Sequence, residues 1–173
     1  MPLDKLNLGA GSRQLDGWLN VDIADNGGSV DLSIFPWPYE PNSASHILAS
    51  HILEHLDKRT AYLFLAECAR VLAPGGELYL AVPDMDIFIN CRLSGDWTPV
   101  NGYVWRDFNW FFGGDEREDR REQRHRYMYN EETLAMMLLT AGLIPSRRQF
   151  IDELDTDDYQ AISLYMLGEK IAL

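Results

Sequence analysis

The sequence is poor in cysteine and contains no long apolar run. Cys68 and Cys91 are the two cysteines among 173 residues, which argues against a disulfide scaffold and favours a reducing compartment. No stretch of about 18 apolar residues could span a bilayer, and residues 1–5 lack the basic region and apolar stretch of a signal peptide. These absences predict a cytoplasmic protein that is not associated with a membrane.

Basic residues are also scarce. Fifteen lysines and arginines stand against 27 acidic residues, a formal net charge of −12, and this argues against a nucleic-acid partner held by phosphate attraction. The densest basic segment, 115–126, carries five acids beside its five arginines. Its pairs Glu116/Arg120 and Glu122/Arg126 have the i,i+4 spacing of a solvated helical face, which is favoured over the alternative of a local basic patch.

A short apolar strand that runs into a glycine turn is the most informative feature present. Residues 5–8 lead into Gly9-Ala10-Gly11, and Asp22 ends the next strand eleven residues past Gly11. Glycine lets the backbone turn tightly and approach a ligand, and the acidic residue can accept hydrogen bonds from ribose hydroxyls. The pattern predicts a nucleotide-type cofactor site. A dinucleotide fingerprint is not favoured, because Gln14 stands where its third glycine should be.

Strands and helices alternate along the chain, which predicts one α/β domain over 1–173 with a doubly wound, mostly parallel sheet and helices on both faces. The expected strands are 4–8, 18–22, 29–32, 46–50 and 76–83, followed by a terminal antiparallel hairpin from 145–151 and 160–168. Helices are expected after Asp57 and after Asn130, and the acids of 152–158 should be solvated. Some nine residues separate the first two strands, so the first crossover is shortened and its helix reduced to about a turn.

Two further segments, His51-Ile52-Leu53-Glu54-His55-Leu56 and Arg70-Val71-Leu72-Ala73-Pro74-Gly75-Gly76, carry a family resemblance. With the glycine turn, they resemble the class I S-adenosylmethionine-dependent methyltransferases, particularly small bacterial members with hLEHL and RVLxPGG segments. The resemblance is close over residues 5–85 and weaker over 125–150. It implies a Rossmann-like fold, S-adenosylmethionine as the cofactor, and methyl transfer to a small-molecule or glycan-like acceptor.

The resemblance also implies which residues contact the cofactor. They are Gly9, Ala10 and Gly11 for the methionine moiety, Asp22 for the ribose, Ile23 against the adenine, Asp31 and Leu32 at the adenine amino group, and Ser50 at the end of strand 46–50. One position departs from the family pattern, because Asn7 replaces the usual acidic residue of the first strand.

Three residues are candidates for acceptor chemistry. His51 follows strand 46–50 and should face the cleft, because ligands of open α/β sheets sit outside the carboxyl ends of the strands. Asp84 follows strand 76–83 at the same edge and either acts as a general base or caps a turn. His125 precedes the second helix and is either a base near the acceptor or a surface histidine.

His51, Glu54 and His55 also match the His-x-x-Glu-His pattern of inverted zinc peptidases. The segment is too short for the long helix of those enzymes and no third ligand is evident, so we expect no metal and keep a zinc hydrolase as the least favoured alternative. The other alternative is a non-catalytic S-adenosylmethionine-binding protein of the same fold, which Asn7 and the short crossover would explain.

A long insertion is predicted over about 88–127, between strand 76–83 and the helix after Asn130. It is rich in aromatic residues, namely Trp97, Tyr103, Trp105, Phe108, Trp110, Phe111 and Phe112. A long insertion in a small domain is often a lid or a binding loop, so it is predicted to cover a small-molecule acceptor. Its alternatives are a satellite core or a contact in a homo-oligomer.

Overall fold

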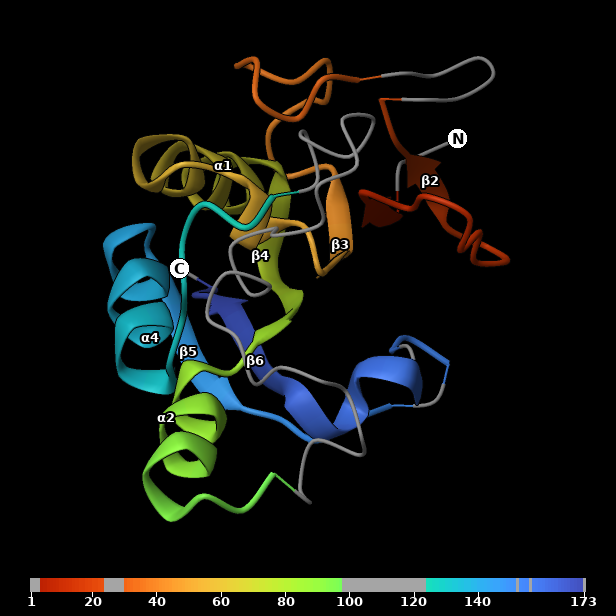
Figure 1. The fold of residues 1–173 in the computed structure, drawn as a ribbon. Coiled ribbons are helices and arrows are strands. Elements are labelled where there is room, and N and C mark those ends of the chain that lie inside the picture. The colour runs from red at the N-terminus through yellow and green to blue at the C-terminus, as the bar shows by residue number, and fades with distance from the viewer. Residues whose placement is uncertain (1–3, 24–29, 98–123, 152, 156, 173) are drawn as a thin grey trace.

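One mixed sheet organises the chain (Figure 1). The computed structural model describes residues 4–23, 30–97, 124–151, 153–155 and 157–172. Within these residues six strands pair in the order β2-β1-β3-β4-β6-β5. They are β1 (Lys5–Leu8), β2 (Leu19–Val21), β3 (Ala44–Ser50), β4 (Leu72–Pro83), β5 (Leu143–Arg147) and β6 (Ser163–Lys170). The first four pair in parallel, whereas β6 runs antiparallel to β4 and β5 to β6. The predicted mostly parallel sheet with a terminal antiparallel hairpin is confirmed.

Three α-helices and two 3-10 turns are described: η1 (Leu53–His55), α1 (Lys58–Val71), α2 (Met85–Ser94), α4 (Glu131–Thr140) and η4 (Asp157–Ile162). Asp57 caps α1 by accepting a hydrogen bond of 2.9 Å from the Thr60 N–H, and Asn130 caps α4 in the same way at Thr133. Both expected helices are therefore confirmed. Helix α2 was not expected; it begins before the predicted insertion and continues into it.

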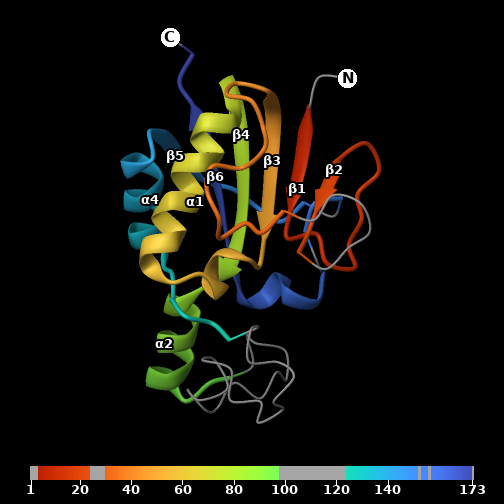
Figure 2. The same ribbon diagram turned by 90° about the horizontal axis from the view of Figure 1, so that it is seen from above.

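The two faces of the sheet are covered differently. Helices α1 and α4 contact each other and lie beside the strands in Figure 2; on their face Leu78, Leu80 and Val82 are fully buried. The opposite face is covered by loops where the structure describes it. There Lys5 lies under the Trp18 ring at 5.7 Å. The expectation of helices on both faces is wrong for the described residues, because both crossovers that would supply the second layer are loops there.

The first crossover, residues 9–18, has no helix and is held by side-chain amides instead. The Asn7 amide nitrogen donates to the Arg13 carbonyl at 2.9 Å and to the Asn20 side-chain oxygen at 2.8 Å. That same Asn20 oxygen accepts from the Leu15 N–H at 2.9 Å. A carboxylate at position 7 could not donate these bonds. The departure from the family pattern at Asn7 thus has a structural reason.

The strand expected at 29–32 is not formed, because residues 30–32 lie outside any strand. Asp31 accepts at Oδ1 from both the N–H and the hydroxyl of Ser33, a local turn that ends extended structure. The loop continues to residue 43 and is anchored on α1. The Trp37 N–H donates to Glu67 Oε1 at 2.7 Å, and the Trp37 ring packs edge-on against Phe64 at 5.2 Å.

The connection between β5 and β6 contains a buried ion pair. Arg148 Nη2 lies 2.6 Å from Asp155 Oδ1, and both side chains are almost fully buried. The Arg148 guanidinium also lies 5.3 Å and 5.4 Å from the ring centroids of Tyr79 and Tyr165. The expectation that the acids of 152–158 are solvated is therefore wrong at Asp155.

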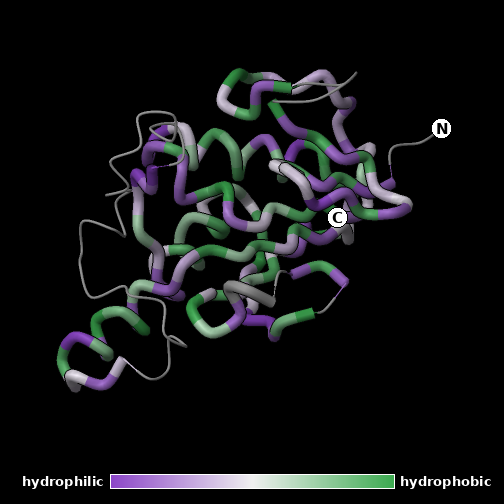
Figure 3. Tube along the Cα trace, turned by 45° about the vertical axis from the view of Figure 1, so that its right-hand side comes forward, coloured by the Kyte–Doolittle hydropathy of each residue, from purple (hydrophilic) through white to green (hydrophobic). Residues whose placement is uncertain are grey.

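The core lies between the sheet and the helices α1 and α4. Figure 3 shows hydrophobic residues along the central strands, and the buried residues of the helices include Leu65, Cys68, Leu134 and Leu138. Cys68 and Cys91 are free and buried. Among the described residues, the helices are too short or too polar to cross a membrane.

Candidate functional site

The parallel strands end at one edge of the sheet, and most predicted site residues follow those ends (Figure 1). The turn 9–11 follows β1, Asp22 follows β2, His51 follows β3 and Asp84 follows β4. Adjacent parallel strands place their carboxyl ends side by side, which is where ligands of open α/β sheets bind. The edge therefore has two parts, one at β1 and β2 and the other at β3 and β4.

The glycine turn adopts backbone conformations that favour glycine. Gly9 has a φ of +67° and Gly11 a φ of +49°. A Cβ on Gly9 would lie 2.6 Å from Ile52 Cδ1, so a larger residue here would have to displace the Ile52 side chain. The Gly11 N–H donates to Asp22 Oδ2 at 2.7 Å. The turn and the acidic end of β2 are therefore joined by a hydrogen bond, and their contact with a cofactor stays a prediction.

A cleft opens between this turn and the loop after β2. Its lining is Gly9, Asp22, Ile23, Val30, Asp31, Leu32, Ser33, Ile52 and Leu56. Five predicted cofactor residues are among them: Gly9, Asp22, Ile23, Asp31 and Leu32. Ala10, Gly11 and Ser50 are not in this lining; Ala10 is buried and Gly11 is exposed.

Four lining residues were missed by the sequence analysis. Val30 and Ser33 flank the predicted pair Asp31-Leu32, whereas Ile52 and Leu56 belong to the hLEHL segment. The spacing of four between Ile52 and Leu56 was the available signal. It places two apolar side chains on the same side of one helical turn.

Asp31 brings a fixed negative charge to the cleft. The hydroxyl and the N–H of Ser33 hold the pKa of Asp31 below the ordinary carboxyl value, against a small opposing effect of burial. Both bonds end on Oδ1 at 2.6 Å and 2.9 Å. Asp31 is therefore oriented as an ionised acceptor.

His51 lies on the other part of the edge in a strained conformation. Its φ is +52°, which is rare for a residue with a Cβ. Its N–H donates to the Ala81 carbonyl at 2.9 Å, and its ring nitrogens lie 3.2 Å from Glu54 Oε1 and 3.0 Å from Ser163 Oγ. A carboxylate on Nδ1 orients an imidazole and strengthens it as a base.

Glu54 is the buried carboxylate of this region, with 1% of its side chain exposed. Burial acts to raise the pKa of Glu54, but the hydrogen bond from His51 and the charges of His51, His55 and His125 outweigh it and hold the pKa below the ordinary value. Oε1 receives the His51 contact, whereas Oε2 is buried without a hydrogen-bond partner. Glu54 is thus a buried anion that depends on its histidines.

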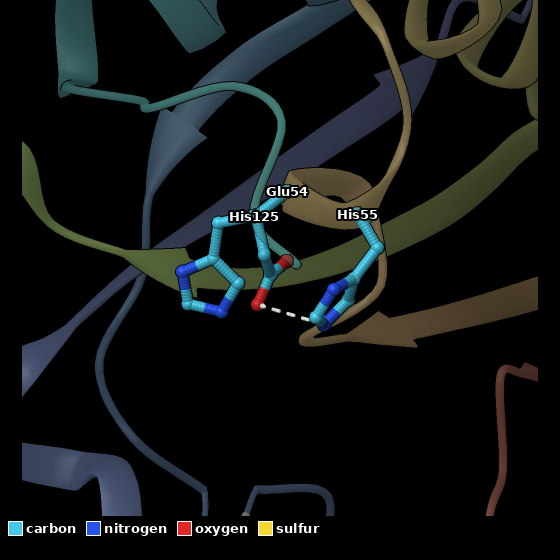
Figure 4. Close-up of side chains that lie close together, drawn as sticks. All are labelled: Glu54, His55 and His125. Carbon is cyan, nitrogen blue, oxygen red and sulfur yellow. Dashed lines mark ion pairs between the residues drawn. The ribbon is translucent and has the colours of Figure 1, made fainter. Parts of the chain in front are cut away.

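His125 joins this cluster from a distant part of the chain. Figure 4 shows the Glu54 carboxylate between the rings of His55 and His125. The two rings meet edge-on with centroids 5.0 Å apart, and one ligand atom from each of the three residues lies within 4.8 Å of the others. The fold thus brings His125 to Glu54 and His55, a group that does not include His51, and the expectation that the His-x-x-Glu-His pattern binds no metal stays a prediction.

Asp84 has a structural role at the start of α2. Its Oδ1 accepts from the Asp86 N–H at 2.9 Å, and Arg147 Nη2 lies 3.9 Å from Oδ2. Burial raises the pKa of Asp84 above the ordinary carboxyl value, against the opposing hydrogen bond from Asp86. Of the two roles considered for Asp84, the cap is present, and the role of general base stays a prediction.

The predicted lid at 88–127 is only partly within the described residues. Its first part is the second half of α2, and Trp97 packs edge-on against Phe88 at 6.0 Å. The other aromatic residues named for the lid, and the salt-bridged face of 115–123, lie outside the described residues. The lid therefore stays a prediction.

Comparison with known proteins supports a methyltransferase. A family model described as a methyltransferase domain matches residues 17–80. Among curated proteins none matches the sequence.

Three solved structures share the fold. An S-adenosylmethionine-dependent methyltransferase from Methanosarcina mazei is 15% identical, with 100% of this chain and 95% of that chain covered and a TM-score of 0.60. A second structure is a chain from the complex of the Haloferax volcanii Trm112 methyltransferase activator with a methyltransferase. It is 16% identical, with 98% of this chain and 82% of that chain covered and a TM-score of 0.62. The third is the Burkholderia thailandensis 1,6-didemethyltoxoflavin-N1-methyltransferase, solved with bound 1,6-didemethyltoxoflavin and S-adenosylhomocysteine. It is 16% identical, with 98% of this chain and 72% of that chain covered and a TM-score of 0.60.

Other matching chains are longer, and this chain covers 30% of one and 47% of another. At these low sequence identities the structural similarity shows the fold alone, which is a Rossmann-like α/β sheet of the class I methyltransferase type. Together, the domain match and this fold support an S-adenosylmethionine-dependent methyltransferase, with S-adenosylmethionine as the cofactor.

Proposed function

We propose that this chain transfers a methyl group from S-adenosylmethionine to a small-molecule or glycan-like acceptor. The observation that carries the proposal is the cleft at β1 and β2, where Gly9, Asp22 and Asp31 meet around one space. These residue types in this order support a bound adenosine group with its sulfonium end at the glycine turn.

The residues of the cleft suit each part of the cofactor. Asp22 offers a carboxylate to the ribose hydroxyls, and Asp31 offers an ionised acceptor to the adenine amino group. The apolar side chains Ile23, Leu32 and Ile52 suit the faces of a flat ring. We assign Ala10 and Gly11 to the methionine moiety and Ser50 to the strand end beside it, as the family resemblance implies.

The cofactor supplies an activated methyl group, and the protein supplies position and a proton acceptor. Holding two reactants in line can contribute most of the rate, so a strong base is not required. His51 is the residue that we assign to the acceptor, because it precedes the cleft residue Ile52 and its Nδ1 lies 3.2 Å from the buried Glu54. Nε2 lies 3.0 Å from Ser163 Oγ and would receive the acceptor proton when the acceptor replaces that contact. Asp84 and His125 are the other candidates at this end.

The acceptor class rests on charge. The net charge of −12 opposes binding of a polyanion, whereas a neutral or cationic small molecule meets no such barrier. The 1,6-didemethyltoxoflavin-N1-methyltransferase that shares this fold was solved with bound 1,6-didemethyltoxoflavin, which is compatible with a small-molecule acceptor. A non-catalytic role has less support, because Asn7 is explained by the crossover that it stabilises. The cytoplasmic location and a homo-oligomeric state remain predictions.

The decisive experiment is calorimetric titration with S-adenosylmethionine and S-adenosylhomocysteine. Asp22→Ala should weaken binding by about 1.5–3 kcal/mol, the value of a hydrogen bond to a charged group, which is about 10- to 150-fold in Kd. Asp16→Ala is the matched control, since Asp16 is an exposed acid on the neighbouring loop. Absence of binding to the wild type, or equal loss in both variants, would contradict the proposal.

A further inference from the structure

Glu54, His55 and His125 form a compact group of potential metal ligands on the acceptor side of the sheet edge. One ligand atom from each lies within 4.8 Å of the other two. Glu54 and His55 come from η1, and His125 comes from the segment that precedes α4. Only one of the three is an acid, so the group is a mixed nitrogen and oxygen donor set.

The backbone holds the two segments together independently of these side chains. The N–H groups of Arg126 and Tyr127 donate to the Glu54 carbonyl at 2.6 Å and 3.3 Å. His125 directly precedes Arg126, so this contact fixes where its side chain begins. The cluster is therefore prearranged by the fold.

The contacts of His55 leave the lone pair of Nε2 available for a metal. His55 Nδ1 lies 3.4 Å from the Arg124 carbonyl oxygen. A carbonyl can only accept, so Nδ1 carries the proton and Nε2 carries the lone pair. Nε2 is the atom that faces Glu54, 4.0 Å from Oε1. A backbone carbonyl on the far nitrogen is the usual support of a metal-binding histidine.

Glu54 provides the independent sign of a missing ligand. Its side chain is 1% exposed, and Oε2 is buried without a hydrogen-bond partner. A buried carboxylate oxygen without a partner is unfavourable, and buried carboxylates are normally paired or coordinate a metal. The oxygen nearest His55 is Oε1, so a cation that is bound by both carboxylate oxygens would also satisfy Oε2.

We propose that Glu54, His55 and His125 bind a divalent transition metal of the Zn²⁺ class. Two imidazoles and one carboxylate suit Zn²⁺, Co²⁺ or Fe²⁺, whereas Mg²⁺ and Ca²⁺ prefer oxygen ligands. Metal bonds of about 2.0–2.1 Å need ligand atoms about 3.3 Å apart, so the side chains must close by up to about 1.5 Å. The rings of His55 and His125 can supply this movement because both are only partly buried.

The bound metal would join the segment 124–127 to η1 beside His51, which contacts Glu54. It thereby differs from the His-x-x-Glu-His reading in one testable respect. That reading uses His51 and His55 as ligands, whereas this site uses His55 and His125 and leaves His51 as a supporting partner of Glu54. The site does not depend on the proposed methyl transfer, because metal binding is measured without cofactor or acceptor.

The test is calorimetric titration of Zn²⁺ alone into the full chain, prepared without an affinity tag and stripped with chelator. One equivalent should bind. His125→Ala and His55→Ala should each weaken binding by more than about 100-fold, since even loss of a supporting partner costs about 10- to 100-fold. His46→Ala is the matched control: His46 Nε2 lies 3.8 Å from Glu77, a histidine and glutamate pair outside this cluster, and its loss should leave the Kd unchanged.

Co²⁺ provides a second readout, because its visible absorption should appear in the wild type and in His46→Ala and be absent in His125→Ala. Circular dichroism of the metal-free proteins shows whether each variant is folded. No Zn²⁺ binding at micromolar concentration would overturn the proposal. So would binding that survives His125→Ala but is lost in His51→Ala, which would support the other ligand set.

Discussion

The sheet edge has two parts: the part at β1 and β2, which we assign to the cofactor and call the cofactor part, and the part at β3 and β4, which we assign to the acceptor and call the acceptor part. The two parts are built in opposite ways. The cofactor part comes from neighbouring loops within residues 9–33 and two residues of the hLEHL segment, and its polar contacts are local, such as Asp31 with Ser33. The acceptor part combines His51, Glu54, His125 and Ser163, which come from three separate segments of the chain. A cofactor loop can therefore be recognised in the sequence from residues that are close in the chain, whereas an acceptor site depends on the packing of residues that are distant in the chain.

The two parts also differ in how charge is held. Asp22 and Asp31 are only partly buried and line an open cleft, so a ligand can use their charge. Glu54 is buried and already interacts with His51. Changes at Asp22 and Asp31 should therefore alter mainly cofactor affinity, and changes in the acceptor part should alter turnover, metal affinity or stability.

The largest expected effect is that of His51→Asn on turnover. Asparagine tolerates a positive φ better than most residues, so the backbone at position 51 should be kept while the imidazole is lost. Turnover on an acceptor identified by screening should fall by about 10²- to 10⁴-fold, the contribution of a positioned acid or base. The Kd for S-adenosylhomocysteine should change less than about threefold. A matching loss of cofactor affinity would remove the distinction between the two parts.

A smaller effect is expected for Asn7→Asp, which tests the loop that carries the cofactor part. The substitution removes the two hydrogen bonds donated to Arg13 and Asn20 and places a carboxylate against their oxygen atoms. The free energy of unfolding in urea should fall by about 2–4 kcal/mol, because each unsatisfied buried group costs about 1–3 kcal/mol. Asn90→Asp, at an exposed position on α2, should change it by less than about 0.5 kcal/mol. Equal effects would show that the amide at position 7 is not required.

The smallest effects are expected at two aspartates that cap helices. Burial raises the pKa of Asp84, so its contribution to stability is fully present below the ordinary carboxyl pKa and is lost as the pH rises through its pKa in the folded state. Asparagine caps helices as well as aspartate does. Asp84→Asn should therefore leave the free energy of unfolding unchanged, or raise it by less than about 1 kcal/mol, at neutral pH and have no effect in acid.

Asp57 is the matched control with the opposite sign. Hydrogen bonds from Thr60 hold the pKa of Asp57 below the ordinary value, so its stabilising effect is present above that value and is lost as the pH falls through the lowered pKa. Asp57→Asn should reduce stability slightly at neutral pH and not in acid. Urea unfolding at both pH values measures this difference. A loss of turnover in Asp84→Asn without a change in stability would identify Asp84 as a base.

Local chemistry made several elements predictable. Asp57 and Asn130 each precede an apolar helical pattern, and both cap the expected helix. Helix α2 carried comparable signals, Asp84 before it and a left-handed Gly95 after it. The sequence analysis missed this helix because its apolar residues do not form a clear stripe. The aromatic residues that follow led to the prediction of an insertion instead. A cap without periodicity was too weak a signal.

The sequence by itself determined the glycine turn, the acidic end of β2, the capped helices and the terminal hairpin, because each depends on backbone conformation or hydrogen bonds between residues close in the chain. Only the tertiary structure decided that Asp155 is buried with Arg148 and that His125 meets Glu54 and His55. These contacts join segments whose separation carries no periodic signal, and burial supplies the energy that selects them. The residues that we assign to the acceptor, His51 and His125, depend on contacts of this second kind.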